Sequence, residues 1–219
     1  MSTDSSQGQV QLLGFLGYAT VALIENSTSW ARLAPALADR VALDGMAIAH
    51  FDRFGLIADE LDILEAPVAE ALAPYQKALD DFGAALQPQD WAEAMTLLTL
   101  TVGLLGDFCI AVRHRLPSEL VRVIGPGVTE RRLLEFSASA VGRQVKDVED
   151  LPGRLAMLGR RVAGEMVSQG QRIAVRDAEL TALISGESGQ DGGDLAVVSD
   201  LLERLVANNA RRMASLGLG

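Results

Sequence analysis

The chain has 219 residues, a net charge of −10 at pH 7 and a hydrophobic fraction of 49%. This length and composition are sufficient for one large hydrophobic core. The acidic balance, with no cluster of Lys and Arg, argues against binding of nucleic acid through phosphate contacts. Cys109 is the only cysteine, so neither an internal disulfide nor a multi-cysteine zinc site can form.

The N-terminal sequence MSTDSSQGQV has no basic segment followed by an apolar one. It therefore does not resemble a secretory signal peptide. Together with the single cysteine, this predicts a protein of the reducing cytoplasm.

Apolar residues at helical spacing predict an all-α chain. In the third predicted helix, Pro74 is expected to break the regular hydrogen bonding. The fourth is expected to begin at Asp90 as N-cap, with Glu93 completing a capping box. Seven segments are expected to be helical: 8–33, 35–64, 67–86, 90–116, 129–149, 153–184 and 195–216.

Long helices with short connections indicate an antiparallel four-helix bundle with additional C-terminal helices. The bundle is expected to occupy residues 8–185. A Gly-rich acidic segment at 186–194 is expected to be a flexible linker, because glycine and serine leave the backbone unrestrained. The last helix would then occupy residues 195–217.

Segment 94–112 contains 19 residues and a single charge, Asp107. A membrane-spanning helix and a helix buried on all sides of a bundle share this composition. No other stretch of the chain is comparable, and three threonines and two glycines interrupt this one. We therefore expect a buried central helix and no membrane span.

Three polar residues are predicted to face the interior of the bundle, one on each of three helices. Glu25 shares a helix face with Tyr18, Val21 and Ala22. Asp107 shares a face with Gly103, Leu104 and Ala111. His50 belongs to an apolar stripe with a spacing of three and four, which comprises Leu43, Met46, Ala47, Phe54, Ile57 and Leu61. Carboxylates and histidines on facing helices are the ligands with which bundles build di-iron sites.

Two segments carry a family resemblance, LLGFLGYATVALIENSTSWARLAPALADRVALDGMAIAHFDRF and GRLAMLGRRVAGEMVSQGQRIAVRDAEL. Over about residues 10–185 the chain resembles the actinobacterial ferritin-like proteins called MiaE-like, after tRNA-(2-methylthio-N6-isopentenyladenosine) hydroxylase. The resemblance implies a ferritin-like bundle and, in true hydroxylases, a carboxylate-bridged di-iron centre that activates oxygen. It does not imply that this chain acts on tRNA, and the charge of −10 argues against such a substrate.

Carried over to this chain, the family pattern is incomplete. Glu25 matches the carboxylate of the first helix, and Asp107 stands where the third helix offers its acid. His50 matches the histidine of a Glu-x-x-His motif, but Ala47 replaces the glutamate. The fourth helix has no histidine, and Glu135 falls off its expected stripe, which comprises Leu134, Ser137, Ala138, Val141 and Val145. Since three of six expected ligands remain, the resemblance implies a degenerate di-iron site with no assigned catalytic residue.

Two functions remain open from the sequence. The first is a non-catalytic binding or scaffold protein without a cofactor, in which His50 hydrogen-bonds Glu25 or Asp107 in the core. The second is an iron-dependent, oxygen-activating hydroxylase or oxidase with one Fe or Mn ion on Glu25, His50 and Asp107. Glu165, in VAGEMVSQ, would then be a candidate fourth oxygen ligand.

The last helix has a heptad-like apolar spacing with an asparagine, Asn209, at a core-type position; the apolar members are Leu195, Val198, Leu202, Leu205 and Leu216. This pattern is typical of a helix that binds a second copy or another protein. A helix that folds back on its own bundle has the same pattern. With only three heptads, the second reading is favoured.

Overall fold

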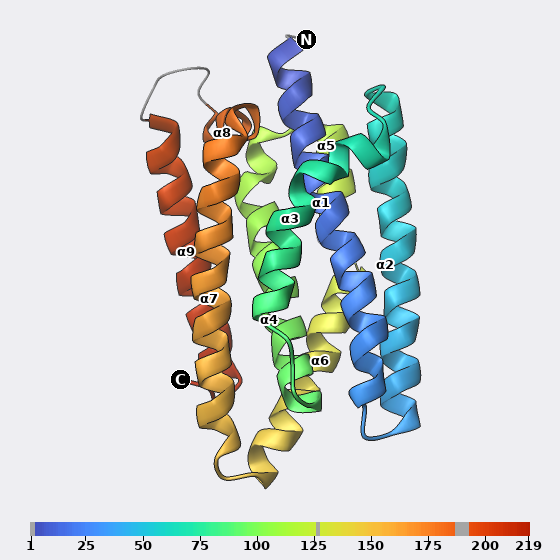
Figure 1. Ribbon diagram of the computed structural model, residues 1–219, viewed down its shortest axis with the longest axis vertical. Coiled ribbons are helices and arrows are strands. Elements are labelled where there is room, and N and C mark those ends of the chain that lie inside the picture. Colours follow the sequence, from blue (N-terminus) through green and yellow to red (C-terminus); the bar gives the residue numbers. More distant parts are fainter. Residues whose placement is uncertain (1–2, 126–127, 187–192) are drawn as a thin grey trace.

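The computed structural model describes residues 3–125, 128–186 and 193–219. Within them 88% of residues are helical and no strand occurs, which confirms the prediction of an all-α chain. The long helices run side by side along the long axis of the molecule (Figure 1).

Each predicted helix is present, with small shifts at the ends. The break expected at Pro74 is absent, because the third helix continues through this residue. The structure has one short helix, α5, that the sequence did not predict. The predicted 153–184 helix is divided at Asp177, because the backbone of this residue (φ −109°, ψ 79°) leaves the helical region. The helices are α1 (Thr3–Trp30), α2 (Leu37–Ile63), α3 (Val68–Ala85), α4 (Trp91–Val112), α5 (Ser118–Ile124), α6 (Val128–Asp147), α7 (Leu151–Arg176), α8 (Ala178–Ser185) and α9 (Gly193–Ser215). Two single 3₁₀ turns, Ala31–Leu33 and Arg113–Arg115, follow α1 and α4.

The four-helix bundle predicted from the sequence is formed by α1, α2, α4 and α6. The helix α1 packs along α2, and α4 packs along α6, while α2 and α6 close one side. On the other side, α7 packs against α3 and α4, and α9 packs against α4, α7 and α8. In Figure 1, α2 lies at one edge of the molecule and α7 and α9 lie at the opposite edge.

The central helix is α4. Its first ten residues are all buried, and the chain enters it through the predicted capping box. The Asp90 side chain accepts from the Glu93 backbone N–H at 2.9 Å, and the Glu93 carboxylate accepts from the Gln89 N–H at 2.7 Å. In the described residues, Trp91–Arg115 is the one helical segment apolar and long enough to cross a membrane. Its burial among the other helices identifies it as a core helix.

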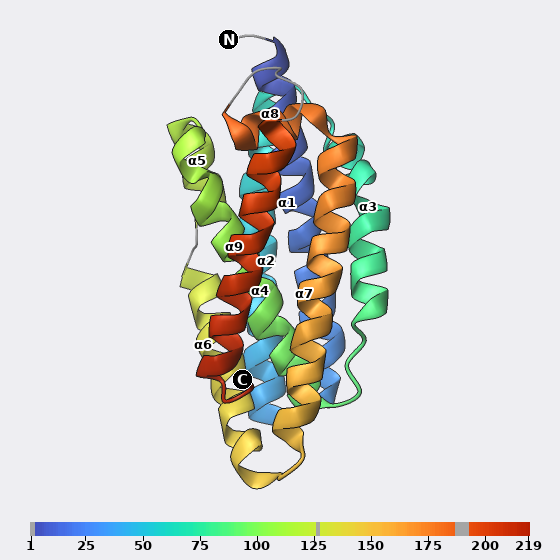
Figure 2. The ribbon, with the colours of Figure 1, turned by 90° about the vertical axis from the view of Figure 1, so that its left-hand side faces the viewer.

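The last helix, α9, folds back on the bundle along α7 (Figure 2). Asn209 is 1% exposed and donates to the carbonyl of Gly159 at 3.4 Å. The helices approach closely here, because a Cβ at Gly159 would lie 2.4 Å from the Met213 sulfur. The apolar face of α9 therefore packs within the chain, as expected for a helix that folds back on its own bundle. The predicted linker, 186–194, lies mostly outside the described residues.

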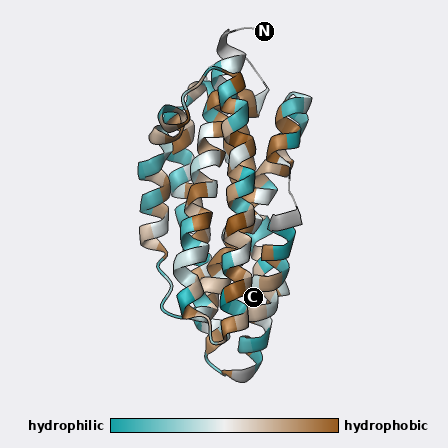
Figure 3. Cartoon of the chain, turned by 90° about the vertical axis from the view of Figure 1, so that its right-hand side faces the viewer, coloured by the Kyte–Doolittle hydropathy of each residue, from teal (hydrophilic) through white to brown (hydrophobic). Residues whose placement is uncertain are grey.

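The apolar surface that remains is concentrated on α2. Six of its large apolar side chains are exposed: Leu37, Val41, Ile48, Phe51, Leu56 and Ile63. Exposed acids, among them Asp52 and Asp59, alternate with them, so apolar and polar residues are mixed on this side (Figure 3). Among the side chains that the structure describes, six exposed large apolar ones therefore lie on α2, and none on α9.

Candidate functional site

The carboxylate expected from α1 does not reach the interior. Glu25 is exposed, so its predicted inward orientation is wrong. The helix α1 is apolar nearly all round, and this pattern does not define which face is buried. The face that packs inward carries Leu16, Thr20, Leu23, Ser27 and Trp30, which excludes position 25.

The other two predicted acids are also placed away from His50. Asp107 binds Arg212 of α9 through an ion pair of 2.8 Å, with about a fifth of each side chain exposed. Glu165 lies on α7, outside the four helices of the bundle, and is half-buried. Throughout the described part of the chain, no group of three His, Cys, Asp or Glu side chains is arranged to hold a metal ion. The predicted set of Glu25, His50, Asp107 and Glu165 is therefore not assembled.

His50 is buried as predicted, with 1% of its surface exposed. Neither ring nitrogen has a hydrogen-bond partner among the described residues, so the expected bond to Glu25 or Asp107 is absent. Burial lowers the pKa of His50 below its ordinary value, and nearby Arg53 adds to this, while Glu130 opposes it. The imidazole is therefore neutral at pH 7.

This burial predicts a loss of stability in acid. Below the ordinary histidine pKa of about 6.5, the unfolded chain takes up a proton that folded His50 resists, so the free energy of unfolding falls as the pH drops. His50→Leu should remove that loss. Above pH 7 it should change stability by less than about 1 kcal/mol, because it deletes two buried unpaired polar atoms. Urea denaturation at pH 7.5 and 5.5 would measure both effects on the free energy of unfolding, with the exposed His114→Gln as the control. If His50→Leu loses as much stability between the two pH values as the parent does, buried His50 is not the cause of the loss.

Next to His50 lies a buried ion pair that the sequence analysis missed. Arg53, one turn after His50, places Nη1 2.6 Å from Oε1 of Glu130 on α6. It also donates to the carbonyls of Gly125 and Ile124 at 2.9 and 3.0 Å. The guanidinium thus joins α2 to α6 and to the end of α5, and its charge is balanced by the Glu130 carboxylate.

Glu130 was missed because the stripe expected for α6 began one turn too late, although its members Ser137 and Val141 are buried as expected. The stripe expected from the sequence began at Leu134, whereas the buried positions are Glu130, Leu133, Ser137, Ala140 and Val141. Glu135 is exposed, as expected. Counting from Glu130 gives Glu-x-x-Leu, which has the spacing of a Glu-x-x-His motif with leucine at the histidine position. This signal was present in the sequence.

The interior beside His50 does not fit a di-iron centre. Such a centre takes a glutamate from each of two helices and Glu-x-x-His from each of the other two. Here α2 offers His50 without a glutamate, and α6 offers Glu130 without a histidine. From α4, Cys109 comes close enough to Arg53 and Glu130 to be influenced by their charges. Burial raises the pKa of this thiol to about 12, so without a metal it is protonated at pH 7.

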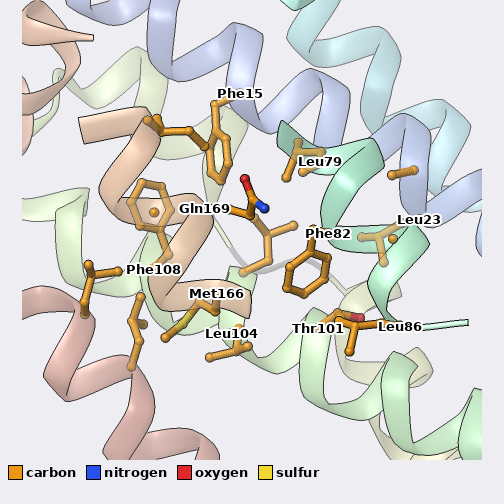
Figure 4. Close-up of a pocket in the computed structure, with 18 of the residues that line it drawn as sticks. Phe15, Leu23, Leu79, Phe82, Leu86, Thr101, Leu104, Phe108, Met166 and Gln169 are labelled. Carbon is orange, nitrogen blue, oxygen red and sulfur yellow. The ribbon is translucent and has the colours of Figure 1, made fainter. Parts of the chain in front are cut away.

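A separate cavity of about 440 Å³ lies on the other side of α1 and α4. Its walls come from α1, α3, α4, α7, α8 and α9, and no described residue of α2 or α6 lines it. Figure 4 shows large apolar side chains directed into it: Phe15, Leu23, Leu79, Phe82, Leu104, Phe108 and Met166. The size and apolar lining are those of small-molecule sites.

Small residues leave this space open. Ala19 and Ala22 on α1, Gly83 on α3, and Gly170 and Ala174 on α7 all line the cavity. At Gly83 nothing lies within 4 Å of where a Cβ would stand. The cavity is partly open to solvent, so a ligand can enter it from outside.

One polar side chain points into the cavity from α7. Gln169 is 5% exposed, and its amide lies among the phenyl rings in Figure 4. The amide oxygen accepts a long hydrogen bond of 3.4 Å from Arg172. The amide nitrogen donates to no group in the described chain and is not among the fully buried polar atoms, so a molecule in the cavity can reach it.

The remaining polar lining offers little charge. The hydroxyls of Thr101 and Thr181 donate to the carbonyls of Leu97 and Ala174, at 2.7 and 2.9 Å. Asp80 accepts from the Tyr18 hydroxyl at 2.7 Å. No Lys, Arg or His of the described residues lines the cavity.

The profile of the family "Ferritin-like domain, actinomycetes" matches residues 4–187. The chain belongs to this ferritin-like family. The fold agrees with that of a solved ferritin-like structure, titled "Protein 19 with aldehyde deformylating oxidase activity from Synechococcus", with a TM-score of 0.61. The sequences are 15% identical, and the match covers 98% of this chain and 96% of the other. At this identity the likeness establishes the fold alone. No protein of curated function matches the ferritin-like chain.

Proposed function

We propose that this chain is a non-catalytic ferritin-like protein of the cytoplasm, related to the MiaE-like hydroxylases, that binds an apolar small molecule. The observation that carries the proposal is the 440 Å³ apolar cavity, which His50, Arg53 and Glu130 do not line. The cavity gives the binding role a location, and the degenerate ligand set gives the reason for the absence of catalysis.

The loss of catalysis is supported by the residues around His50. Ala47 and Leu133 stand at two of the missing ligand positions, and both are buried. The carboxylate that remains, Glu130, is bound by Arg53. A guanidinium supplies the positive charge that a buried carboxylate requires, so this pair is complete without a metal.

Binding of an apolar molecule is supported by the lining. Side chains around an empty apolar void lose dispersion contacts on one side, and a ligand that fills the void restores them. Each buried methylene of such a ligand adds roughly 0.8 kcal/mol from the hydrophobic effect. A molecule with a long hydrocarbon portion would therefore bind tightly without charged contacts.

A filled cavity tests the proposal. Leucine at Gly83 would project into open space, so Gly83→Leu should fold and weaken the binding of Nile red, an uncharged apolar dye, by at least about tenfold, or 1.4 kcal/mol. Gly164→Leu, on the exposed face of α7, is the matched control and should bind normally. Equal dye affinity in both variants would overturn the proposed cavity function.

The alternative is an iron-dependent hydroxylase or oxidase, which we keep because the solved relative is named for an oxidase activity. Elemental analysis of protein purified without chelator separates the two. Our proposal expects well under one Fe or Mn per chain. One or two tightly held ions, released by His50→Ala in a folded protein, would establish the alternative.

A further inference from the structure

We infer that the cavity selects an uncharged long-chain compound with one hydrogen-bond-accepting group, which the amide of Gln169 binds. The inference rests on the proposed function and names the ligand class of the same site. It is carried by the shape of the cavity, by the lack of a cation in its lining, and by the unpaired donor that points into it.

The cavity is long. On α1 its lining residues run from Phe15 to Trp30, which is about 22 Å at 1.5 Å per residue. On α4 they run from Leu97 to Phe108, about 16 Å. The lining is therefore long enough to contact an extended hydrocarbon chain along its length.

A charged head group would find no partner inside. Moving a carboxylate from water into an apolar site is strongly unfavourable unless a cation pairs with it, and no cationic side chain of the described residues lines the cavity. The acid at the edge, Asp80, is bound by Tyr18. Nearby Arg161 and Arg176 donate to the carbonyls of Ala85 and Pro74, outside the cavity.

Gln169 provides the polar contact. It is surrounded on α7 by Met166, Gly170 and Ile173, which also line the cavity. Its amide nitrogen has no acceptor in the described chain, so a carbonyl, ester or hydroxyl oxygen of a ligand would satisfy it. An alkane fills the same volume but leaves the donor unpaired. Selection therefore depends on a hydrogen bond to Gln169 within a mostly apolar contact surface, whose other polar residues are Asn26, Asp80, Thr101 and Thr181.

Competition against Nile red tests the ligand class with four probes of equal chain length: hexadecane, hexadecanol, methyl palmitate and palmitate. At pH 8, where palmitate is ionised, the alcohol and the ester should compete at least about tenfold more strongly than palmitate. They should also compete more strongly than hexadecane. Palmitate as the strongest competitor would overturn the inference.

The role of Gln169 is tested by Gln169→Leu, which keeps the volume and removes the amide. The alcohol and the ester should lose about tenfold in affinity, a factor equal to 1.4 kcal/mol, while hexadecane should bind at least as well as before. Gln171→Leu, exposed on the same helix, is the control. If Gly83→Leu blocks all probes but Gln169→Leu changes none, this inference fails and the cavity function stands. If Gly83→Leu blocks none, the cavity function itself fails.

Discussion

The variant Arg53→Met is expected to lower the free energy of unfolding by about 3–5 kcal/mol, the range for breaking a buried ion pair from one side. Only 18% of the Arg53 side chain and 11% of that of Glu130 are exposed, so water replaces little of the lost contact. The variant leaves a buried carboxylate without its cation. It also leaves the carbonyls of Gly125 and Ile124 without this donor.

Urea denaturation of the variant and two controls would measure this effect. Arg40→Met removes an exposed pair with Asp44, at 3.9 Å, and should cost less than about 0.5 kcal/mol. In Arg53→Met/Glu130→Leu both charges are gone, and much of the loss should be recovered, because replacing a buried pair by apolar residues is often nearly neutral. A cost for Arg53→Met no larger than that for Arg40→Met would show that the pair does not hold α2 to α6.

The fold was predictable from local patterns. The residues at spacings of three and four on α2 indicated which face of this helix is buried. Leu43, Ala47 and His50 all lie on that face, although other apolar residues of α2 are exposed. The capping box at Asp90 and Glu93 needs only residues three apart, so it was also recoverable. These features depend on residues close in the sequence, where helical geometry is fixed.

The site was less predictable, for two physical reasons. The helix α1 is apolar on several faces, so periodicity could not decide that Glu25 points outward. Glu130 lies one turn before the predicted stripe of α6, so its position could be read from the sequence, but its pairing with Arg53, 77 positions earlier, could not. The cavity is hidden for the same reason, since its walls come from six helices and its openness depends on glycines and alanines that each look ordinary.

Ala47→Glu is expected to lower the melting temperature by about 10 °C in the presence of a chelator. Ala47 is 2% exposed, on the same face of α2 as His50, so the new side chain would be buried. A buried carboxyl without a partner costs several kcal/mol or takes up a proton. For a chain of this size, each kcal/mol lowers the melting temperature by roughly 2–4 °C. Ile48→Glu is the matched control, because Ile48 is 68% exposed and adjacent in sequence.

The same variant tests the ancestry of the site. Ala47→Glu restores Glu-x-x-His at 47–50, so added Fe(II) or Mn(II) should recover part of the lost melting temperature by binding only the folded state. The parent should respond much less. Recovery should be larger in Ala47→Glu/Arg53→Met, where Glu130 is released from its guanidinium and can act as a second carboxylate. If added metal changes the melting temperature of neither Ala47→Glu nor Ala47→Glu/Arg53→Met, the position beside His50 is not a remnant of a metal site. If Ala47→Glu and Ile48→Glu have the same melting temperature in chelator, position 47 does not face the core.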